Sequence, residues 1–354
     1  MNIKRTDNFK RGLLKFLSAS PFAGLLNASA AESKVSRIAF GSCAHQDKPQ
    51  PIWNAIVAEQ PDAFIFLGDN IYGDSDDPEV LKAKYQKLAS KPGFQQLKAQ
   101  VPVFATWDDH DYGQNDSGHE YVSKEESRKI MLEFWNEPKD SDRWHRPDGI
   151  YTSEIIEADD KKIQIILLDL RWNRTELETV SNLSELGERN RNNQGPYNPG
   201  ADPQSTLMGE AQWLWLEEQM QLEADFRIIG SSIQLLADFT GWETWLNFPD
   251  ERERFIELMK SNQQCPAIII SGDVHWCELS RMNVEGMSQP LLELTSSGLT
   301  EIWEQISPNK HRVGEAFAVE NFGLIEIDWS GQTPSVSLFV KGVEGNTLIE
   351  YHSI

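Results

Sequence analysis

The chain has 354 residues, of which 39% are hydrophobic and 25% are charged, so it can bury a sizeable core as one large domain or two small ones. Its 55 acidic residues outnumber its 33 basic ones, and the formal net charge at pH 7 is −22. This balance disfavours a standing partnership with nucleic acid or an anionic membrane, and it is compatible with chemistry that requires metal cations. An acidic surface also keeps an exported protein soluble.

The first thirty residues have the features of an export signal. A basic start precedes an apolar stretch, residues 12–26, and a small-residue cleavage site, residues 28–30. The stretch is too short to serve as a transmembrane anchor. Residues 10–15 resemble a twin-arginine signal with Lys10 in place of the first arginine, so twin-arginine and general secretory export both stay open. We expect the export machinery to act on residues 1–30, and residues 31–354 to form a single domain in the periplasm or outside the cell.

The chain contains three cysteines, Cys43, Cys265 and Cys277. An odd number does not indicate a disulfide scaffold. The predicted strand between Cys265 and Cys277 holds their backbones too far apart for a disulfide. We expect free thiols.

Strands and helices alternate through the first part of the chain, and polar residues follow each strand. The predicted strands are residues 35–40, 63–67 and 101–105, and the predicted helices are residues 53–59, 80–88 and 124–135. The strands lead into Gly41-Ser42-Cys43, Gly68-Asp69-Asn70-Ile71-Tyr72 and Trp107-Asp108-Asp109-His110-Asp111, in that order. This alternation predicts a parallel sheet built by right-handed crossovers.

The second part continues the pattern and then changes to strands alone. The predicted elements are strands 149–156 and 163–169 joined by a turn at 158–161, a long polar loop at 181–205, helix 208–222, strand 226–233, helix 251–261 and strand 267–271. The last of these strands leads into Gly272-Asp273-Val274-His275. Strands then follow at 291–296, 323–328, 335–341 and 348–352. No linker or repeat separates a second domain.

Four strand ends carry residues that bind metals in proteins. They are Cys43, Asp69 with Tyr72, the acidic cluster 108–111, and Asp273 with His275. Each motif alone is weak, since Asp and His also cap helices and form turns. Together they indicate a metal site, because the carboxyl ends of parallel strands meet at one edge and crowded buried acids require compensating charge. In an extended segment Asp273 and His275 share a face, so we expect one to point toward each of two cations, which Asp69 can bridge.

These four motifs, in this order, resemble those of the alkaline phosphatase D (PhoD-like) family of calcineurin-like metallophosphoesterases. The resemblance runs from about Arg37 to Asp328. It implies an α/β fold, a four-layer α/β/β/α sandwich with the C-terminal all-strand segment in the same domain. It also implies a dinuclear metal site at the strand ends.

The resemblance assigns ligands to both metals. A ferric ion would be held by Cys43, Asp69, Tyr72 and His275, whose thiolate and phenolate suit a strongly Lewis-acidic ion. A calcium ion would share Asp69 and take Asp109 and Asp273, with Asp108 as an alternative to Asp109. Gln234 or Ser232 is a candidate for a remaining ligand.

The implied activity is hydrolysis of small-molecule phosphate esters, monoesters and also diesters, by attack of a metal-bound hydroxide. His110 would act on the leaving oxygen as general acid or electrostatic donor. Arg171 would be a second phosphate contact, or alternatively a salt bridge at a strand end. Two other functions stay open: a phosphodiesterase or phospholipase specificity, with residues 181–205, Trp242 and Trp245 lining the pocket, and an exported metal- or phosphate-binding protein without turnover.

Overall fold

A computed structural model describes residues 35–353 except 159, 201, 203 and 332. The predicted export signal, residues 1–30, lies outside the described residues, as does Asp159 in the predicted turn at 158–161. In the described part of the chain, no helix combines the length and apolar character needed to cross a bilayer.

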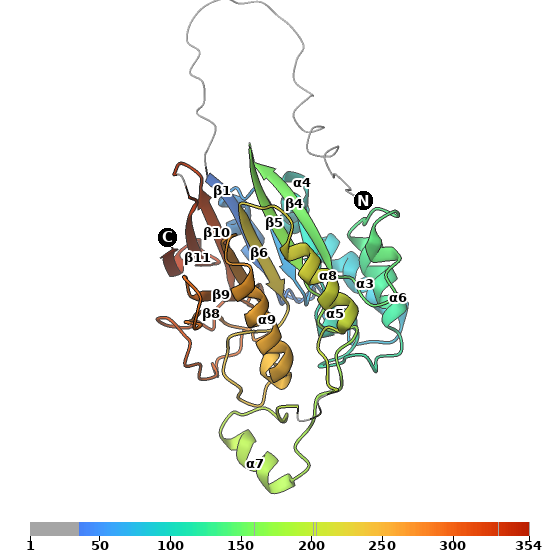
Figure 1. Cartoon of the computed structure of the whole chain (residues 1–354). Coiled ribbons are helices and arrows are strands. Elements are labelled where there is room, and N and C mark those ends of the chain that lie inside the picture. The colour runs from blue at the N-terminus through green and yellow to red at the C-terminus, as the bar shows by residue number, and fades with distance from the viewer. Residues whose placement is uncertain (1–34, 159, 201, 203, 332, 354) are drawn as a thin grey trace, which may run out of the picture. The chain divides into compact units, whose positions relative to one another are not determined.

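Two mixed six-stranded sheets form the centre of the described chain (Figure 1). The first sheet has the order β12-β11-β10-β1-β2-β3, with β1 Val35–Gly41, β2 Ala63–Leu67, β3 Val103–Thr106, β10 Asn321–Asp328, β11 Ser335–Gly342 and β12 Thr347–Ser353. The second has the order β4-β5-β6-β7-β9-β8, with β4 Thr152–Ala158, β5 Lys161–Leu167, β6 Phe226–Ser231, β7 Ala267–Ser271, β8 Cys277–Met282 and β9 Leu291–Ser296. Within them β1, β2 and β3 are parallel, as are β5, β6, β7 and β9.

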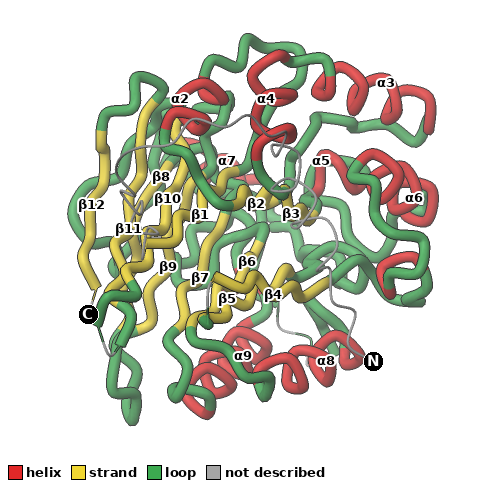
Figure 2. Tube along the Cα trace, turned by 90° about the horizontal axis from the view of Figure 1, so that it is seen from above, coloured by secondary structure: helices red, strands yellow, loops and turns green. Residues whose placement is uncertain are grey.

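Helices cover the outer face of each sheet (Figure 2). The first sheet is covered by α2 Ile52–Ala58, α3 Pro78–Ala89, α4 Pro92–Gln100 and α6 Lys124–Phe134, and the second by α8 Glu210–Met220 and α9 Pro249–Ser261. Short segments complete the fold: α5 Asp109–Tyr112, α7 Leu183–Arg191, and the 3-10 turns Asp142–Trp144 and Trp245–Asn247. The predicted four-layer α/β/β/α sandwich is confirmed.

Strand β2 shows why the layers form. Its five residues are completely buried, and successive side chains point to opposite faces. Phe64 and Phe66 pack with the helices, while Ile65 and Leu67 pack between the two sheets. A continuous apolar run of this kind is stable only with a layer on each side.

The structure differs from the sequence predictions in several elements. Helix α4 and strand β8 were not predicted, and β3 begins at Val103 rather than Val101. The predicted loop 181–205 contains helix α7, none of whose side chains is buried. A helix without a buried apolar face lacks the hydrophobic periodicity by which helices are predicted. Its start is nevertheless marked, because the Asn182 side chain accepts hydrogen bonds from Ser184 N and Glu185 N.

Candidate metal centre

The predicted ligands converge at the carboxyl ends of four strands. Cys43 follows β1, Asp69 and Tyr72 follow β2, Asp109 begins α5 after β3, and Asp273 and His275 follow β7. Three groups of side chains have ligand atoms within 4.8 Å of one another: Cys43, Asp69 and His275; Asp69, Asp109 and His110; and Asp108, Asp109 and Asp273. Asp69 belongs to two of these groups and Asp109 to two. The groups therefore form one continuous cluster.

The backbone at these positions is left-handed, which the sequence prediction missed. Asp273 and His275 have φ values of 72° and 63°, so the expectation that they lie in an extended segment was wrong. Cys43 and Asp69 have φ values of 64° and 50°. Non-glycine residues in this region carry strain and concentrate at functional sites. The direction of these side chains is therefore set by tight turns, and not by the alternation of side chains along a strand.

A glycine brings the β2 and β3 loops together. Gly68 has a φ of +98°, and a Cβ there would clash with the side chain and backbone of Asp108. The absence of a side chain at position 68 therefore lets the two loops approach closely, and this brings the carboxylates of Asp69 and Asp109 together.

The first part of the cluster holds the thiol, the phenol and an imidazole. Cys43 Sγ lies 3.5 Å from Asp69 Oδ2, and Tyr72 Oη lies 3.0 Å from His275 Nε2. Burial raises the pKa of Cys43 well above its ordinary value, and the charge of Asp69 raises it further. Ser297 contacts Cys43 Sγ at 3.2 Å and accepts a hydrogen bond from His275 N at 2.9 Å.

The second part of the cluster is a group of carboxylates. Asp109 Oδ2 accepts a hydrogen bond from Asp116 N at 2.7 Å, while its Oδ1 accepts none within the described residues. Burial raises the pKa of Asp109, but the charges of Arg171 and His110 overcome this and leave it at about 2. Burial together with Asp108 and Glu243 raises the pKa of Asp273 well above its ordinary value. Asp109 Oδ1 is buried without a hydrogen bond, and the neighbouring Asp273 is hard to ionise. A bound cation fits this site, because it would supply the missing positive charge.

His110 faces this cluster as a charged donor. Its Nδ1 lies 2.7 Å from Asp74 Oδ1, and its ring lies 4.3 Å from that of Tyr72. Burial lowers the pKa of His110, but Asp69, Asp109 and Asp74 raise it to about 11. These three carboxylates favour the charged form of the imidazole.

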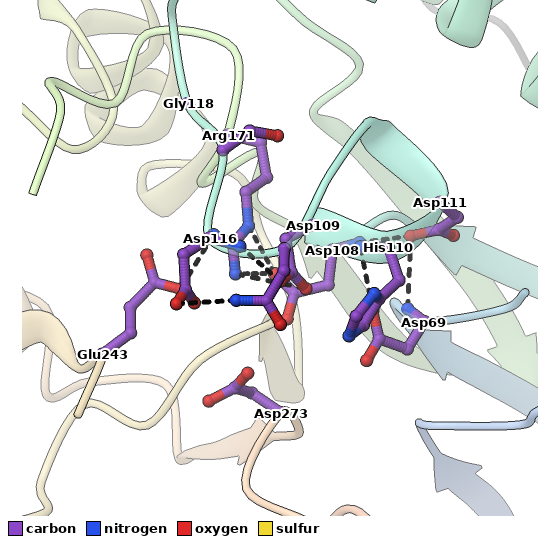
Figure 3. Close-up of polar contacts among 12 residues, drawn as sticks. Asp69, Asp108, Asp109, His110, Asp111, Asp116, Gly118, Arg171, Glu243 and Asp273 are labelled. Carbon is purple, nitrogen blue, oxygen red and sulfur yellow. Dashed lines mark hydrogen bonds and ion pairs between the residues drawn. The ribbon is translucent and has the colours of Figure 1, made fainter. Parts of the chain in front are cut away.

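Asp108 and Asp111 support the turn that carries His110 (Figure 3). Asp111 accepts hydrogen bonds from Asp69 N at 3.2 Å and Asp108 N at 2.7 Å. Asp108 lies 2.7 Å from Arg171 Nε.

Arg171 is fully buried among carboxylates rather than open to a ligand. It forms ion pairs with Asp108 at 2.6 Å and Glu243 at 2.8 Å, and it lies 3.8 Å from Asp109. Its exposed fraction is 0%. Of the two predicted roles, this geometry favours the salt bridge over the phosphate contact.

Glu243 and Asp116 belong to the same network and were missed. Neither follows a strand directly, although Glu243 lies in the aromatic loop 241–245, where a single acid among tryptophans was the available signal. The predicted lining residue Trp245 is completely buried against Trp213 and Phe255, so it belongs to the core.

The two candidates for a remaining ligand differ in their surroundings. The amide nitrogen of Gln234 donates to Glu278 at 2.6 Å and to Thr295 at 3.0 Å. The hydroxyl of Ser232 is buried and forms no hydrogen bond within the described residues, and it lies near enough to Asp108 to oppose the rise in the pKa of that acid.

Known proteins share both the sequence pattern and the fold. The sequence matches the PhoD-like phosphatase family over residues 38–133 and 161–324. The fold resembles the structure of PhoD, with a TM-score of 0.64 and 17% identity over 90% of this chain and 72% of that one. It also resembles a dimetal phosphatase from Danio rerio, with a TM-score of 0.55 and 14% identity over 90% and 98% of the two chains. No curated protein matches the sequence.

A third similar structure has a different role. It is GAP50, described as the anchor in the inner membrane complex of Plasmodium, with a TM-score of 0.56 and 14% identity over 90% of this chain and 88% of that one. Fold alone therefore does not decide activity. The family match covers most of this sequence, however, and the chain belongs to the PhoD-like phosphatase family, the metal-dependent hydrolases of phosphoric esters.

Proposed function

We propose that this protein is an exported phosphatase with two metal ions that hydrolyses phosphate monoesters and also diesters. The observation that carries the proposal is the position of Asp69, whose carboxylate belongs both to the group with Cys43 and His275 and to the group with Asp109 and His110. A carboxylate has two oxygens, so Asp69 can bridge two cations.

The donor types divide the cluster between two kinds of metal. Cys43, Asp69, Tyr72 and His275 offer sulfur, oxygen and nitrogen, a set suited to ferric iron. Asp69, Asp109 and Asp273 offer oxygen alone, a set suited to calcium. When bound, such a pair supplies Lewis acidity toward the phosphoryl oxygens and a nucleophilic hydroxide at neutral pH.

The protein's own residues would orient the ester and move the proton. The protonated His110 imidazole would donate to the leaving oxygen or hold a phosphoryl oxygen. Asp74 would keep His110 charged, and Asp111 would fix the backbone on which it sits. Burial of the acidic side chains would exclude bulk water and strengthen each of these interactions.

Export is supported by the sequence of residues 1–30, and it places the protein in the periplasm or outside the cell. Its partners would then be the export machinery and small-molecule phosphate esters. The net charge of −22 argues against a standing nucleic-acid partner. Fractionation of cells that express the full chain tests this: the protein should appear outside the cytoplasm without residues 1–30.

Substitution of two predicted metal ligands, Asp69 and His275, tests whether the metal centre carries out the hydrolysis. Asp69→Asn and His275→Ala should abolish hydrolysis of an aryl phosphate while the circular dichroism spectrum stays that of the wild type. The exposed residues His119 and Asp140 provide matched controls, since His119→Ala and Asp140→Asn should leave turnover unchanged. Near-normal turnover in either ligand variant would refute the proposal.

The visible spectrum tests the iron assignment separately. Ferric iron bound to Tyr72 should absorb visible light through phenolate charge transfer, and Tyr72→Phe should remove that absorption. A colourless, iron-free and fully active enzyme would contradict the choice of iron and leave the calcium assignment standing.

Two alternatives are decided by assay. A phosphodiesterase or phospholipase specificity requires a higher kcat/KM for diesters than for monoesters in a matched substrate panel. A binding protein without turnover requires no hydrolysis when Ca²⁺ and Fe³⁺ are both added. His110 together with a complete set of ligand side chains counts against the second alternative, because turnover needs a general acid beside the metals and binding alone does not.

A further inference from the structure

A buried chain of charges connects the aromatic loop 241–245 to the predicted calcium ligand Asp109 (Figure 3). Glu243 Oε2 lies 2.8 Å from Arg171 Nη1, and Arg171 Nη2 lies 2.6 Å from Asp108 Oδ1. The same Nη2 lies 3.8 Å from Asp109 Oδ1. The exposed fractions of the side chains of Arg171, Asp108, Glu243 and Asp109 are 0%, 1%, 2% and 4%. Water therefore does not screen these charges.

The distances show that the Arg171 guanidinium lies closer to two of its neighbouring carboxylates than to the third. Its guanidinium makes close ion pairs with Asp108 and Glu243, but it stays a full ångström farther from Asp109. The oxygen that it faces, Asp109 Oδ1, accepts no hydrogen bond within the described residues. If the charge of Glu243 were lost, Arg171 would be drawn toward this free oxygen, because a buried guanidinium requires a counter-charge.

A series of hydrogen bonds also connects Asp109 to the aromatic loop 241–245. Asp116 N donates to Asp109 Oδ2 at 2.7 Å, and the Asp116 carboxylate accepts a hydrogen bond from Tyr197 Oη at 2.5 Å. Tyr197 N in turn donates to Gly241 O at 3.0 Å. The hydrogen bond that holds the Asp109 carboxylate is therefore linked, through Asp116 and Tyr197, to the loop that carries Glu243.

We propose that Glu243 is a positioning residue that holds Arg171 away from Asp109, keeps the Asp109 carboxylate available to the second cation, and so sets the calcium affinity of the enzyme. Glu243 also offsets the positive charge of Arg171, which would otherwise repel a cation. The inference rests on the proposed function, since it requires Asp109 to be a calcium ligand.

Calcium titration of the full-length enzyme after calcium depletion tests the inference without relying on activity. By isothermal calorimetry, Glu243→Gln should bind Ca²⁺ about tenfold or more weakly than the wild type, a change of about 1.4 kcal/mol. Glu243→Asp, which keeps the charge, should recover most of the affinity. Glu137→Gln is the matched control, because Glu137 forms another buried ion pair, 3.3 Å from Arg143, outside the cluster. It should leave calcium affinity unchanged.

Steady-state kinetics provide a second readout that a general loss of structure would not reproduce. In Glu243→Gln, the Ca²⁺ concentration for half-maximal hydrolysis of an aryl phosphate should rise by the same factor as Kd, while kcat at saturating Ca²⁺ stays close to that of the wild type. A raised KM for the ester with unchanged calcium dependence would place Arg171 on the phosphate and overturn the inference.

Two comparisons separate this inference from the proposed function. If Asp109→Asn weakens calcium binding and Glu243→Gln does not, the positioning role is wrong and the ligand assignment stands. If neither variant weakens it, the assignment of Asp109 as a ligand fails. Should Glu243→Gln not fold, the double variant Arg171→Gln/Glu243→Gln removes both charges together. It should bind Ca²⁺ nearly as tightly as the wild type, and weak binding there would also overturn the inference.

Discussion

His110 is placed to donate a proton because the carboxylates around it favour its charged form. Its Nδ1 is bonded to Asp74, so the other ring nitrogen is the one available to a leaving oxygen. A donor of this kind contributes most when the leaving group is a poor one, since a good leaving group departs without protonation.

Replacement of His110 should therefore have an effect that depends on the substrate. We expect His110→Asn to lower kcat about 10²–10⁴-fold for an alkyl phosphate and much less for a nitrophenyl phosphate. Asp74→Asn is the matched comparison, because asparagine tolerates the φ of 47° at this position, and it should lower kcat by a smaller factor. Equal losses of kcat on both substrates in His110→Asn would argue against a proton donor.

Single residues stood out in the sequence where their chemistry is unusual. Cys43, Tyr72 and His275 drew attention because a thiol, a phenol and an imidazole lie in the loops that follow strands β1, β2 and β7. Glu243 did not, because a glutamate in a surface-like loop is common. Its role depends on the approach of Arg171 from another part of the chain, and sequence spacing contains no information about that approach.

Loops rather than strands fix the final geometry of the site. Gly195 N donates to Thr240 O at 3.0 Å, and Trp242 Nε1 donates to Asn193 O at 3.3 Å. The segment 193–197 and the aromatic loop therefore form one interlocked unit. Their backbones meet at Gly195 and Gly241, where a side chain on either residue would clash with the other.

Gly195→Ala should disrupt this unit. Since the new methyl group would collide with the backbone of Gly241 and Trp242, we expect a loss of about 1–3 kcal/mol in the free energy of unfolding and weaker calcium binding. Gly187→Ala in α7 is the control, because the nearest atom to its Cβ would lie 3.6 Å away. That change should be neutral or slightly stabilising. Denaturant unfolding of both variants decides the point.

Glu293 on β9 links stability to pH away from the metal cluster. Its carboxylate accepts hydrogen bonds from Leu235 N and Leu236 N at 2.7 Å each, and the nearby charges are Glu278 and Arg252. Burial raises the pKa of Glu293 from 4.5 to about 7. A raised carboxyl pKa means that the folded state binds the proton more tightly, so this contribution to stability is present below pH 4.5 and is lost as the pH rises through 7.

Glu293→Gln should remove that pH dependence. Between pH 4.5 and pH 8, the free energy of unfolding of the wild type should fall relative to that of Glu293→Gln by about 3 kcal/mol. Urea unfolding at a series of pH values measures the difference. Parallel pH profiles for the two proteins would show that Glu293 has the same pKa in the folded and unfolded states.

At the scale of the whole molecule, two sheets from distant parts of the sequence contribute to one cluster. Cys43, Asp69 and Asp109 come from the end of the first sheet, and Asp273 and His275 from the end of the second. A cation held among them would join the two sheets and offset the repulsion between their buried acids. Metal binding should therefore stabilise the folded protein as well as serve catalysis.

Chelation should lower the melting temperature. Calcium present at about 100 times its Kd would stabilise the fold by about 2.7 kcal/mol, and a chelator would remove that contribution. Scanning calorimetry with and without a calcium chelator measures the shift. Asp109→Asn should show a smaller shift than the wild type, and a melting temperature independent of both metals would contradict a cation between the sheets.

The sequence by itself determined the layers and the chemical types at the site. Apolar runs such as 63–67 must be covered on both faces. The thiol of Cys43 and the acids that follow three other predicted strands lie at the carboxyl ends of those strands, where ligands bind. Only the tertiary structure decided the left-handed turns at Asp273 and His275, the burial of Arg171 and the part played by Glu243. Arg171 meets Asp108 and Glu243 from distant parts of the chain, and His275 N donates to Ser297 from another loop. A local sequence pattern does not specify which distant segment will pack against it.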